Sequence, residues 1–149
     1  MANWPDPNID IERGYNMCFG CGKDNPIGLK LHFHWDGKTA RAEFTPNRLH
    51  QGWTEVVHGG IINSILDEAM SYAAIFHGSY CVTAKMETRI RRPARIDEPL
   101  SISSHVTRNT KRLVEAQASI STKDGTVIAE GKATMFVVAK KEDKPKSNA

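Results

Sequence analysis

The feature that most constrains the fold is one segment with helical periodicity, residues 59–77, set among shorter segments that alternate like strands. Its apolar residues recur every three or four positions and so share one side of a helix; they are Ile61, Ile65, Ala69, Tyr72, Ala73 and Phe76. Gly78 follows, and glycine is common just after a helix end. The apolar side of a lone helix must be covered by other elements, and here only strands are on offer.

The segments around the helix have the two-residue alternation of half-buried strands. Residues 29–35 place an apolar side chain at every second position, and Asp36 and Gly37 form a typical hairpin turn before a strand at 38–44. Further strands are expected near 82–91, 100–108, 112–121 and 126–138. This order predicts an α+β fold, in which an antiparallel sheet of about six strands packs on one long helix.

The length of 149 residues fits a single domain. Residues 1–28, rich in Pro, Asn, Asp and Gly, are expected to be an irregular segment packed on a domain of residues 29–139. The polar residues 140–149 are expected to be a disordered tail. Because one helix covers only part of such a sheet, a second copy of the chain is expected to cover the rest or pair with an edge. We therefore expect a homodimer, or a homotetramer built as a dimer of dimers.

Charge and hydropathy exclude several partners. The net charge is +3 and no Lys/Arg stripe with interleaved aromatic residues is present, so no nucleic-acid partner is expected. No apolar run approaches the ~20 residues of a membrane-spanning helix, so no membrane partner is expected. The three cysteines cannot all pair within one chain, which favours a reducing, cytoplasmic location.

The start of the helix is the first candidate for chemistry. Gly59 and Gly60 lie where backbone N–H groups lack helical partners and the helix dipole is positive. Glycine there lets a ligand approach closely, and such N–H groups stabilise a carbonyl oxygen that becomes negative in a transition state. A tight turn into the helix is the simpler alternative for the same two glycines.

Asp67 lies on a polar strip of this helix, together with Asn63, Ser64 and Ser71. The helix carries no Lys or Arg, which favours a site or a subunit contact over a solvated face, the other reading of the strip. Gly60 and Asp67 are separated by about 10 Å of helical rise, so one carbonyl group cannot contact both on one helix. If they act together, they come from two antiparallel helices of a two-fold dimer.

The segment HGGIINSILDEAM, residues 58–70, resembles the helix signature of hotdog-fold acyl-CoA thioesterases of the phenylacetate-pathway type. In that signature a catalytic Asp follows nine residues after the His, which here is Asp67 after His58. CFGCGKDNPIGLKLHF and RRPARIDEPLSI also resemble recurring segments of this group, so the resemblance spans about residues 16–138. It implies a hotdog fold, with the sheet wrapped around a central helix, and hydrolysis of acyl-CoA or aryl-CoA thioesters.

The resemblance also implies roles for single residues. The Gly60 N–H would polarise the thioester carbonyl, Gly59 would let the acyl group pass close to the chain, and His58 would orient the loop. Asp67 from the partner subunit would be the general base or the nucleophile, and Thr83 would help to hold water.

The substrate-binding set includes one departure from the family pattern. Relatives often have Asn six residues before the His, where this chain has Gly52, so His50 or Gln51 is expected to replace it. Trp53 is expected to border the acyl pocket, and Asn63 to line it from the helix.

Basic residues are candidates for the phosphates of coenzyme A, which enters as part of the substrate; no cofactor of the protein's own is expected. By strand alternation Arg89 and Arg91 share one face, and Lys111 and Arg112 lie in a nearby turn. A solvated basic face is the alternative.

No metal is expected, because Cys18 and Cys21 supply only two ligands and a loop-packing role suits them better. His32 and His34 share a strand face and make a Cys2His2 zinc site conceivable. The main functional alternative is a non-catalytic acyl-CoA-binding protein on the same fold. A hydratase is disfavoured because it needs a basic His with a carboxylate partner on the helix, whereas His58 precedes this helix.

Overall fold

The computed structural model describes residues 16–141, so the expectations for residues 1–15 and 142–149 lie outside the described residues. The element order is β1 (His34–Trp35), β2 (Ala40–Phe44), the 3-10 helix η1 (Arg48–His50), α1 (Gly59–Phe76), β3 (Ser79–Ile90), β4 (Leu100–Asn109), β5 (Leu113–Thr122) and β6 (Val127–Lys140). The predicted order of two strands, one long helix and four strands is confirmed. No helix in the described part is long and apolar enough to cross a membrane.

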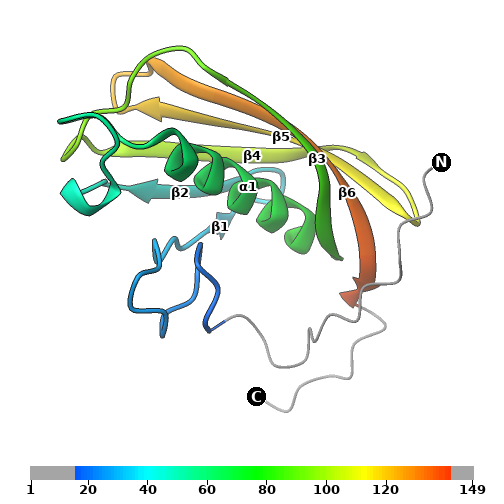
Figure 1. Ribbon diagram of the computed structural model, residues 1–149. Helices are drawn as coiled ribbons and strands as arrows, with labels where there is room; N and C mark the ends of the chain where they lie inside the picture. Colours follow the sequence, from blue (N-terminus) through cyan, green and yellow to red (C-terminus); the bar gives the residue numbers. More distant parts are fainter. Residues whose placement is uncertain (1–15, 142–149) are drawn as a thin grey trace.

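All six strands form one antiparallel sheet in the order β1-β2-β4-β5-β6-β3. Figure 1 shows the sheet curving around α1, which lies across its concave face. The predicted hotdog fold, a sheet wrapped around one central helix, is therefore confirmed. The order leaves β3, one of the longest strands, at an edge of the sheet.

The helix is buried along a broader stripe than its sequence predicts. Ile65, Ala69 and Ala73 are fully buried, as expected, but Ile61, Tyr72 and Phe76 are only partly covered. The stripe is completed by Ile62, Leu66, Met70 and Ala74. The shift has a geometric cause, because a curved sheet covers more of the helix circumference than a flat one. Gly131 on β6 has no side chain where Leu66 and Met70 approach it.

The first predicted strand is shorter than expected. Leu29, Leu31 and Phe33 are buried, as the alternation predicts, but only His34 and Trp35 pair with β2. The N–H groups of Leu29 and Leu31 donate instead to the carbonyl oxygens of Phe19 and Gly20, at 2.8 and 2.9 Å. The segment 16–31 is therefore a folded loop that closes on itself beside the helix.

One buried hydrogen bond ties the sheet to the middle of α1. Ser104 on β4 is 1% exposed, and its hydroxyl donates to the backbone carbonyl oxygen of Ala69 at 2.5 Å. Its neighbour Ser103 faces the other side of the sheet and lines a surface groove there. The two serines thus offer a matched pair, one inside the fold and one outside.

We predict that Ser104→Ala lowers the free energy of unfolding by about 1 kcal/mol, because it removes a buried hydrogen bond. Ser103→Ala should change it by less than about 0.5 kcal/mol, as expected for a surface substitution. Urea denaturation followed by circular dichroism measures both values. Equal effects of the two substitutions would show that the bond to Ala69 contributes nothing to stability.

Candidate active site

His58 is the N-cap of α1, and its ring closes the start of the helix. The Nδ1 atom accepts a hydrogen bond from the Gly60 N–H at 2.8 Å, while the His58 carbonyl oxygen accepts from Ile61 and Ile62. The His58 N–H donates to the carbonyl oxygen of His50 at 2.9 Å. The His58 ring therefore caps the helix, and the Gly60 N–H is engaged by the imidazole.

The two glycines at this helix start differ in their surroundings. A Cβ atom on Gly60 would lie 3.0 Å from His58 Nδ1, so glycine is what allows the ring to cap the helix so closely. A Cβ atom on Gly59 would have only the Ile90 side chain nearby, at 3.8 Å. Both glycines are exposed, so another molecule can approach the chain here.

The loop before the helix uses both residues that were expected to replace the missing Asn. His50 Nδ1 accepts from the Asn47 N–H at 3.0 Å, and Gln51 Oε1 accepts from the Glu55 N–H at 2.9 Å. Burial lowers the pKa of His50, which favours the neutral ring that accepts this bond. Both side chains thus fix the loop conformation in this structure.

Gly52 and Trp53 border a hollow next to the helix start. The hollow has a volume of about 400 Å³ and is also lined by Val56, His58 and Gly59. A Cβ atom on Gly52 would lie 3.2 Å from His58 Cα, so the Asn of relatives would require this loop to move. Trp53 is 86% exposed, an unusual state for so large an apolar side chain.

Asp67 and Thr83 form the central contact between α1 and β3. The Thr83 hydroxyl donates to Asp67 Oδ1 at 2.6 Å, and both residues are half-buried. One helical turn earlier, Asn63 accepts from the Thr88 hydroxyl at 2.6 Å and donates to the Gly59 carbonyl oxygen at 2.8 Å. Asn63 and Asp67 of the polar strip therefore face the edge strand and not bulk solvent.

Thr88 was missed by the sequence reasoning, and the reason is local. Thr83 and Thr88 both point to α1 although they are an odd number of residues apart, because the register of β3 shifts between Thr83 and Lys85. A bulge of this kind reverses the alternation on either side of it. Strand periodicity alone cannot place both threonines on one face.

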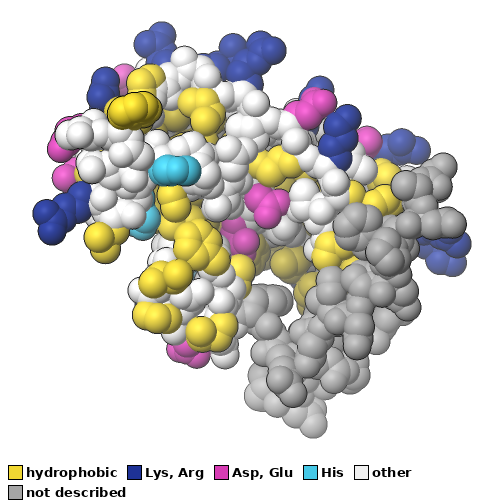
Figure 2. Space-filling model, viewed as in Figure 1, with side chains coloured by type: hydrophobic (Ala, Val, Ile, Leu, Met, Phe, Trp, Pro, Cys, Tyr) yellow, Lys and Arg dark blue, Asp and Glu magenta, His cyan; other side chains and the backbone are white. Residues whose placement is uncertain are grey.

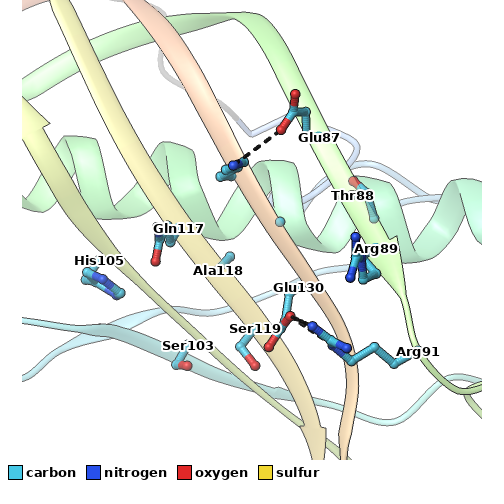
Figure 3. A pocket seen from close by; sticks show the side chains of 12 residues that line it. Glu87, Thr88, Arg89, Arg91, Ser103, His105, Gln117, Ala118, Ser119 and Glu130 are labelled. Atoms are coloured by element: carbon cyan, nitrogen blue, oxygen red, sulfur yellow. Dashed lines mark hydrogen bonds and ion pairs between the residues drawn. The ribbon is translucent and has the colours of Figure 1, made fainter.

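The basic residues expected to bind phosphate lie elsewhere. Arg89 and Arg91 line an open groove of about 520 Å³ on the outer face of the sheet, behind which α1 is visible in Figure 3. Arg91 is paired there with Glu130 at 2.8 Å. Figure 2 shows the opposite, helix-bearing face, where Lys and Arg lie around the rim and acidic side chains near the centre.

Lys111 and Arg112 are at the far end of the sheet from Arg89. In the register of β3 and β6, the backbone of Arg89 lies opposite Glu130. The Arg112 carbonyl oxygen, by contrast, accepts a hydrogen bond from the N–H of Val137 on β6. Those two positions on β6 are about 23 Å apart at 3.3 Å per strand residue. One chain therefore does not bring the two pairs of cations to one phosphate group, nor does it bring Gly60 to Asp67.

Several solved structures share this fold. The protein smu.793 from Streptococcus mutans, solved bound to acetyl-CoA, has 16% identity and a TM-score of 0.70, over 74% of this chain and 90% of that chain. The E. coli PaaI protein from the phenylacetic acid degradation operon has 18% identity and a TM-score of 0.70, over 75% of this chain and 82% of that chain.

A hypothetical thioesterase from Streptococcus pneumoniae, solved with coenzyme A, has 15% identity and a TM-score of 0.70, over 74% of this chain and 87% of that chain. Mutants of the S. pneumoniae thioesterase, one with an Asp and one with a Thr replaced by Ala, also match. A comparison with curated proteins gave no significant match. The model of the Thioesterase superfamily matches residues 54–129, just over half of the chain, and the protein therefore belongs to that superfamily.

Proposed function

We propose that the protein hydrolyses acyl-CoA or aryl-CoA thioesters at two equivalent sites, each shared between two chains. The observation that carries this proposal is the hydrogen bond from Thr83 to Asp67, which holds a carboxylate against an edge strand. The exposed glycine start of the same helix lies toward the other end of that strand, beside Ile90. One chain thus supplies two half-sites that complement each other.

The reaction follows from the groups in these half-sites. The thioester carbonyl oxygen takes the place of His58 Nδ1 at the Gly60 N–H, where the helix dipole favours the negative charge that develops. Asp67 of the partner either removes a proton from an attacking water or attacks the carbonyl carbon itself. The carbon–sulfur bond then breaks, and the coenzyme A thiolate leaves with a proton from the medium or from the base. If Asp67 is the nucleophile, the acyl group stays on its carboxylate as an anhydride, and water then hydrolyses this anhydride to the free acid and regenerates Asp67.

Thr83 fixes the carboxylate for this attack. Its hydroxyl donates to one carboxylate oxygen and leaves the other for water or for the substrate. In the S. pneumoniae thioesterase, the mutated Thr follows the mutated Asp at the separation of 16 residues that Thr83 has from Asp67. This spacing supports the assignment of the pair.

The edge strand supplies the geometry of the shared site. Along β3 the contacts with α1 run in order, from Asp67 at Thr83, through Asn63 at Thr88, to Gly59 near Ile90. If two β3 strands pair antiparallel with the two-fold axis between Met86 and Glu87, Thr83 of one chain lies opposite the partner's Ile90. Asp67 of one chain then lies beside the partner's Gly59 and Gly60.

Exposed apolar side chains support the same interface. Ile90 is 45% exposed at the end of β3, and Trp53 stands out beside the helix start. A long edge strand with unpaired backbone groups is also a surface that proteins usually cover. A homodimer through β3, alone or as half of a tetramer, covers both features.

Coenzyme A enters this scheme as part of the substrate, and the reaction uses no cofactor of the protein. Arg89 is the better placed of the outer-face cations for a phosphate group, because Arg91 is already paired with Glu130. Lys111 and Arg112 belong to a separate cluster, which would contact a different part of the ligand or a second molecule of it.

We predict that Asp67→Asn lowers kcat by at least about 100-fold, since a general base contributes typically 10²–10⁴-fold. Glu68→Gln should lower it far less, because Glu68 points to Cys18 and not to Thr83. Release of free thiol from a panel of acyl- and aryl-CoAs measures the rates, with circular dichroism as the check on folding. A larger loss in Glu68→Gln would reassign the carboxylate, and binding without turnover in the wild type would favour the non-catalytic alternative.

Thr83 provides a finer test of how Asp67 is held. Thr83→Val should lower kcat by about 10-fold or more with little change in KM, as expected for loss of a hydrogen bond to a charged group. Thr83→Ser keeps the hydroxyl and should restore most of the rate. Equal rates for the Val and Ser variants would mean that the hydroxyl does not act on Asp67 during the reaction.

The shared site is tested by complementation between two inactive chains. Gly60→Pro removes the N–H, and the first helical turn tolerates proline. Co-expressed with Asp67→Asn, it should give mixed dimers with about half of the wild-type activity per chain, because one of the two sites in each mixed dimer is intact. The measurement is kcat per chain of the mixed dimer, isolated through two different affinity tags.

The reference for this experiment is each single variant as a homodimer, which should be inactive. Sedimentation should show dimers in every preparation. No recovery in folded mixed dimers would place Gly60 and Asp67 in separate functions, and an active monomer would rule out sharing altogether.

A further inference from the structure

A second cluster of reactive side chains lies behind the proposed site, where the loop of residues 16–22 packs on α1. The ligand atoms of Cys18, Cys21 and Glu68 all lie within 4.8 Å of one another. Cys18 Sγ is 3.6 and 3.8 Å from the two carboxylate oxygens of Glu68. All three residues are half-buried, so they are neither free surface groups nor part of the apolar core.

The loop that carries the two cysteines is tightly folded. The Gly22 N–H donates to the Cys18 carbonyl oxygen at 2.8 Å, which turns the chain so that both thiols lie near Glu68. A Cβ atom on Gly22 would lie 2.4 Å from the Asn16 carbonyl oxygen, and one on Gly20 would lie 2.5 Å from the Glu68 carboxyl group. Both glycines are therefore required for this arrangement, and the loop is held close to the helix.

The three groups of the cluster all become negative when they lose a proton. No ion pair of Glu68 with Lys or Arg is found in the described part of the chain. The Tyr72 hydroxyl, one turn after Glu68, hydrogen-bonds to Cys21. Three potential anions thus converge on one point with a hydrogen-bond donor behind them.

We propose that Cys18, Cys21 and Glu68 bind one Zn²⁺ ion, with water as the fourth ligand. Thiolates select zinc over Mg²⁺ and Ca²⁺, which take oxygen ligands. At a Zn–S distance of about 2.3 Å, two thiolates of a tetrahedral site lie about 3.8 Å apart. The distances between the three ligand atoms need to shorten by about 1 Å at most to reach this geometry. The hydrogen bond of Tyr72 to Cys21 would help to orient that thiolate toward the ion.

This site differs from both interpretations of the two cysteines that the sequence allowed. No metal was expected there, and the conceivable alternative paired the cysteines with His32 and His34. Among the described residues the cysteines meet Glu68 instead, and the two histidines are not part of the cluster. The signal was missed because Glu68 follows Cys18 by 50 residues and belongs to a different element.

The expected consequence of zinc is structural. Such an ion links the loop of residues 16–22 to the middle of α1, one residue after Asp67. Because the cluster points away from Thr83, zinc takes no part in bond breaking at the thioester.

Metal analysis of the purified full-length protein tests the proposal without any activity readout. The protein is reduced, dialysed against Zn²⁺ and then against buffer, and its zinc is measured by mass spectrometry; we expect one ion per chain. Replacement by Co²⁺ should give the near-ultraviolet thiolate charge-transfer band of a thiolate-bound metal. Affinity should rise with pH, because the thiols release protons on binding.

Variants then identify the ligands. Cys18→Ser and Glu68→Gln should each lower the affinity for Zn²⁺ by more than about 10-fold, measured in competition with a chromophoric chelator. Even the loss of a group that only hydrogen-bonds to a metal ligand lowers metal affinity by roughly 10- to 100-fold. Cys81→Ser, which removes the third cysteine on β3, should leave affinity unchanged and serves as the matched control. Zinc should raise the Tm of the wild type and of Cys81→Ser only.

Two results would overturn the proposal. One is a reduced wild-type protein that retains no zinc after dialysis, a result that does not depend on any variant folding. The other is full zinc affinity in Glu68→Gln, judged on protein that circular dichroism shows to be folded. Both results leave the thioesterase proposal intact, because its tests measure turnover.

Discussion

The burial of α1 in the curved sheet determines where every functional group lies. Ile62, Leu66 and Met70 are almost completely excluded from water, and each such side chain contributes roughly 1.5–3 kcal/mol to folding. This fixes the rotation of the helix about its own axis. Once the rotation is fixed, Asn63 and Asp67 must face β3, and Glu68 must face the loop beside the helix. The core therefore orients the polar groups on the other sides of the helix.

Much of this arrangement is encoded in local sequence patterns. The three- and four-residue recurrence predicted the helix, the two-residue alternation predicted the strands, and Gly78, with φ of 102°, ends the helix as expected. The family signature pointed to Asp67, and the absence of cations on the polar strip pointed to its unusual setting. The predictions of the helix and the strands succeeded because each depends on residues that are near one another in the chain, whereas the role of Asp67 stays a prediction.

Other features depend on contacts between distant segments and were not predictable in that way. The contact of Thr88 with Asn63 requires a register shift in β3, which no periodicity reveals. The cluster of Cys18 with Glu68 requires the first loop to fold back on the helix. Arg89 and Arg112 were grouped because the turn that carries Arg112 was expected to lie near the strand that carries Arg89, but the length of the sheet separates them. In each case tertiary structure sets the strand register or the distance that decides which residues meet.

The neighbouring carboxylates Asp67 and Glu68 show how one helix serves two purposes. Consecutive residues are about 100° apart around a helix, so adjacent side chains enter different environments. Asp67 accepts a hydrogen bond from a neutral hydroxyl on an edge strand, as the proposed shared site requires. Glu68 receives two thiols in a folded loop, an environment that suits a bound cation better than a free charge. A one-residue shift of the helix would place Glu68 opposite Thr83 instead of Asp67, so the packing of Leu66 and Met70 selects which carboxylate faces β3.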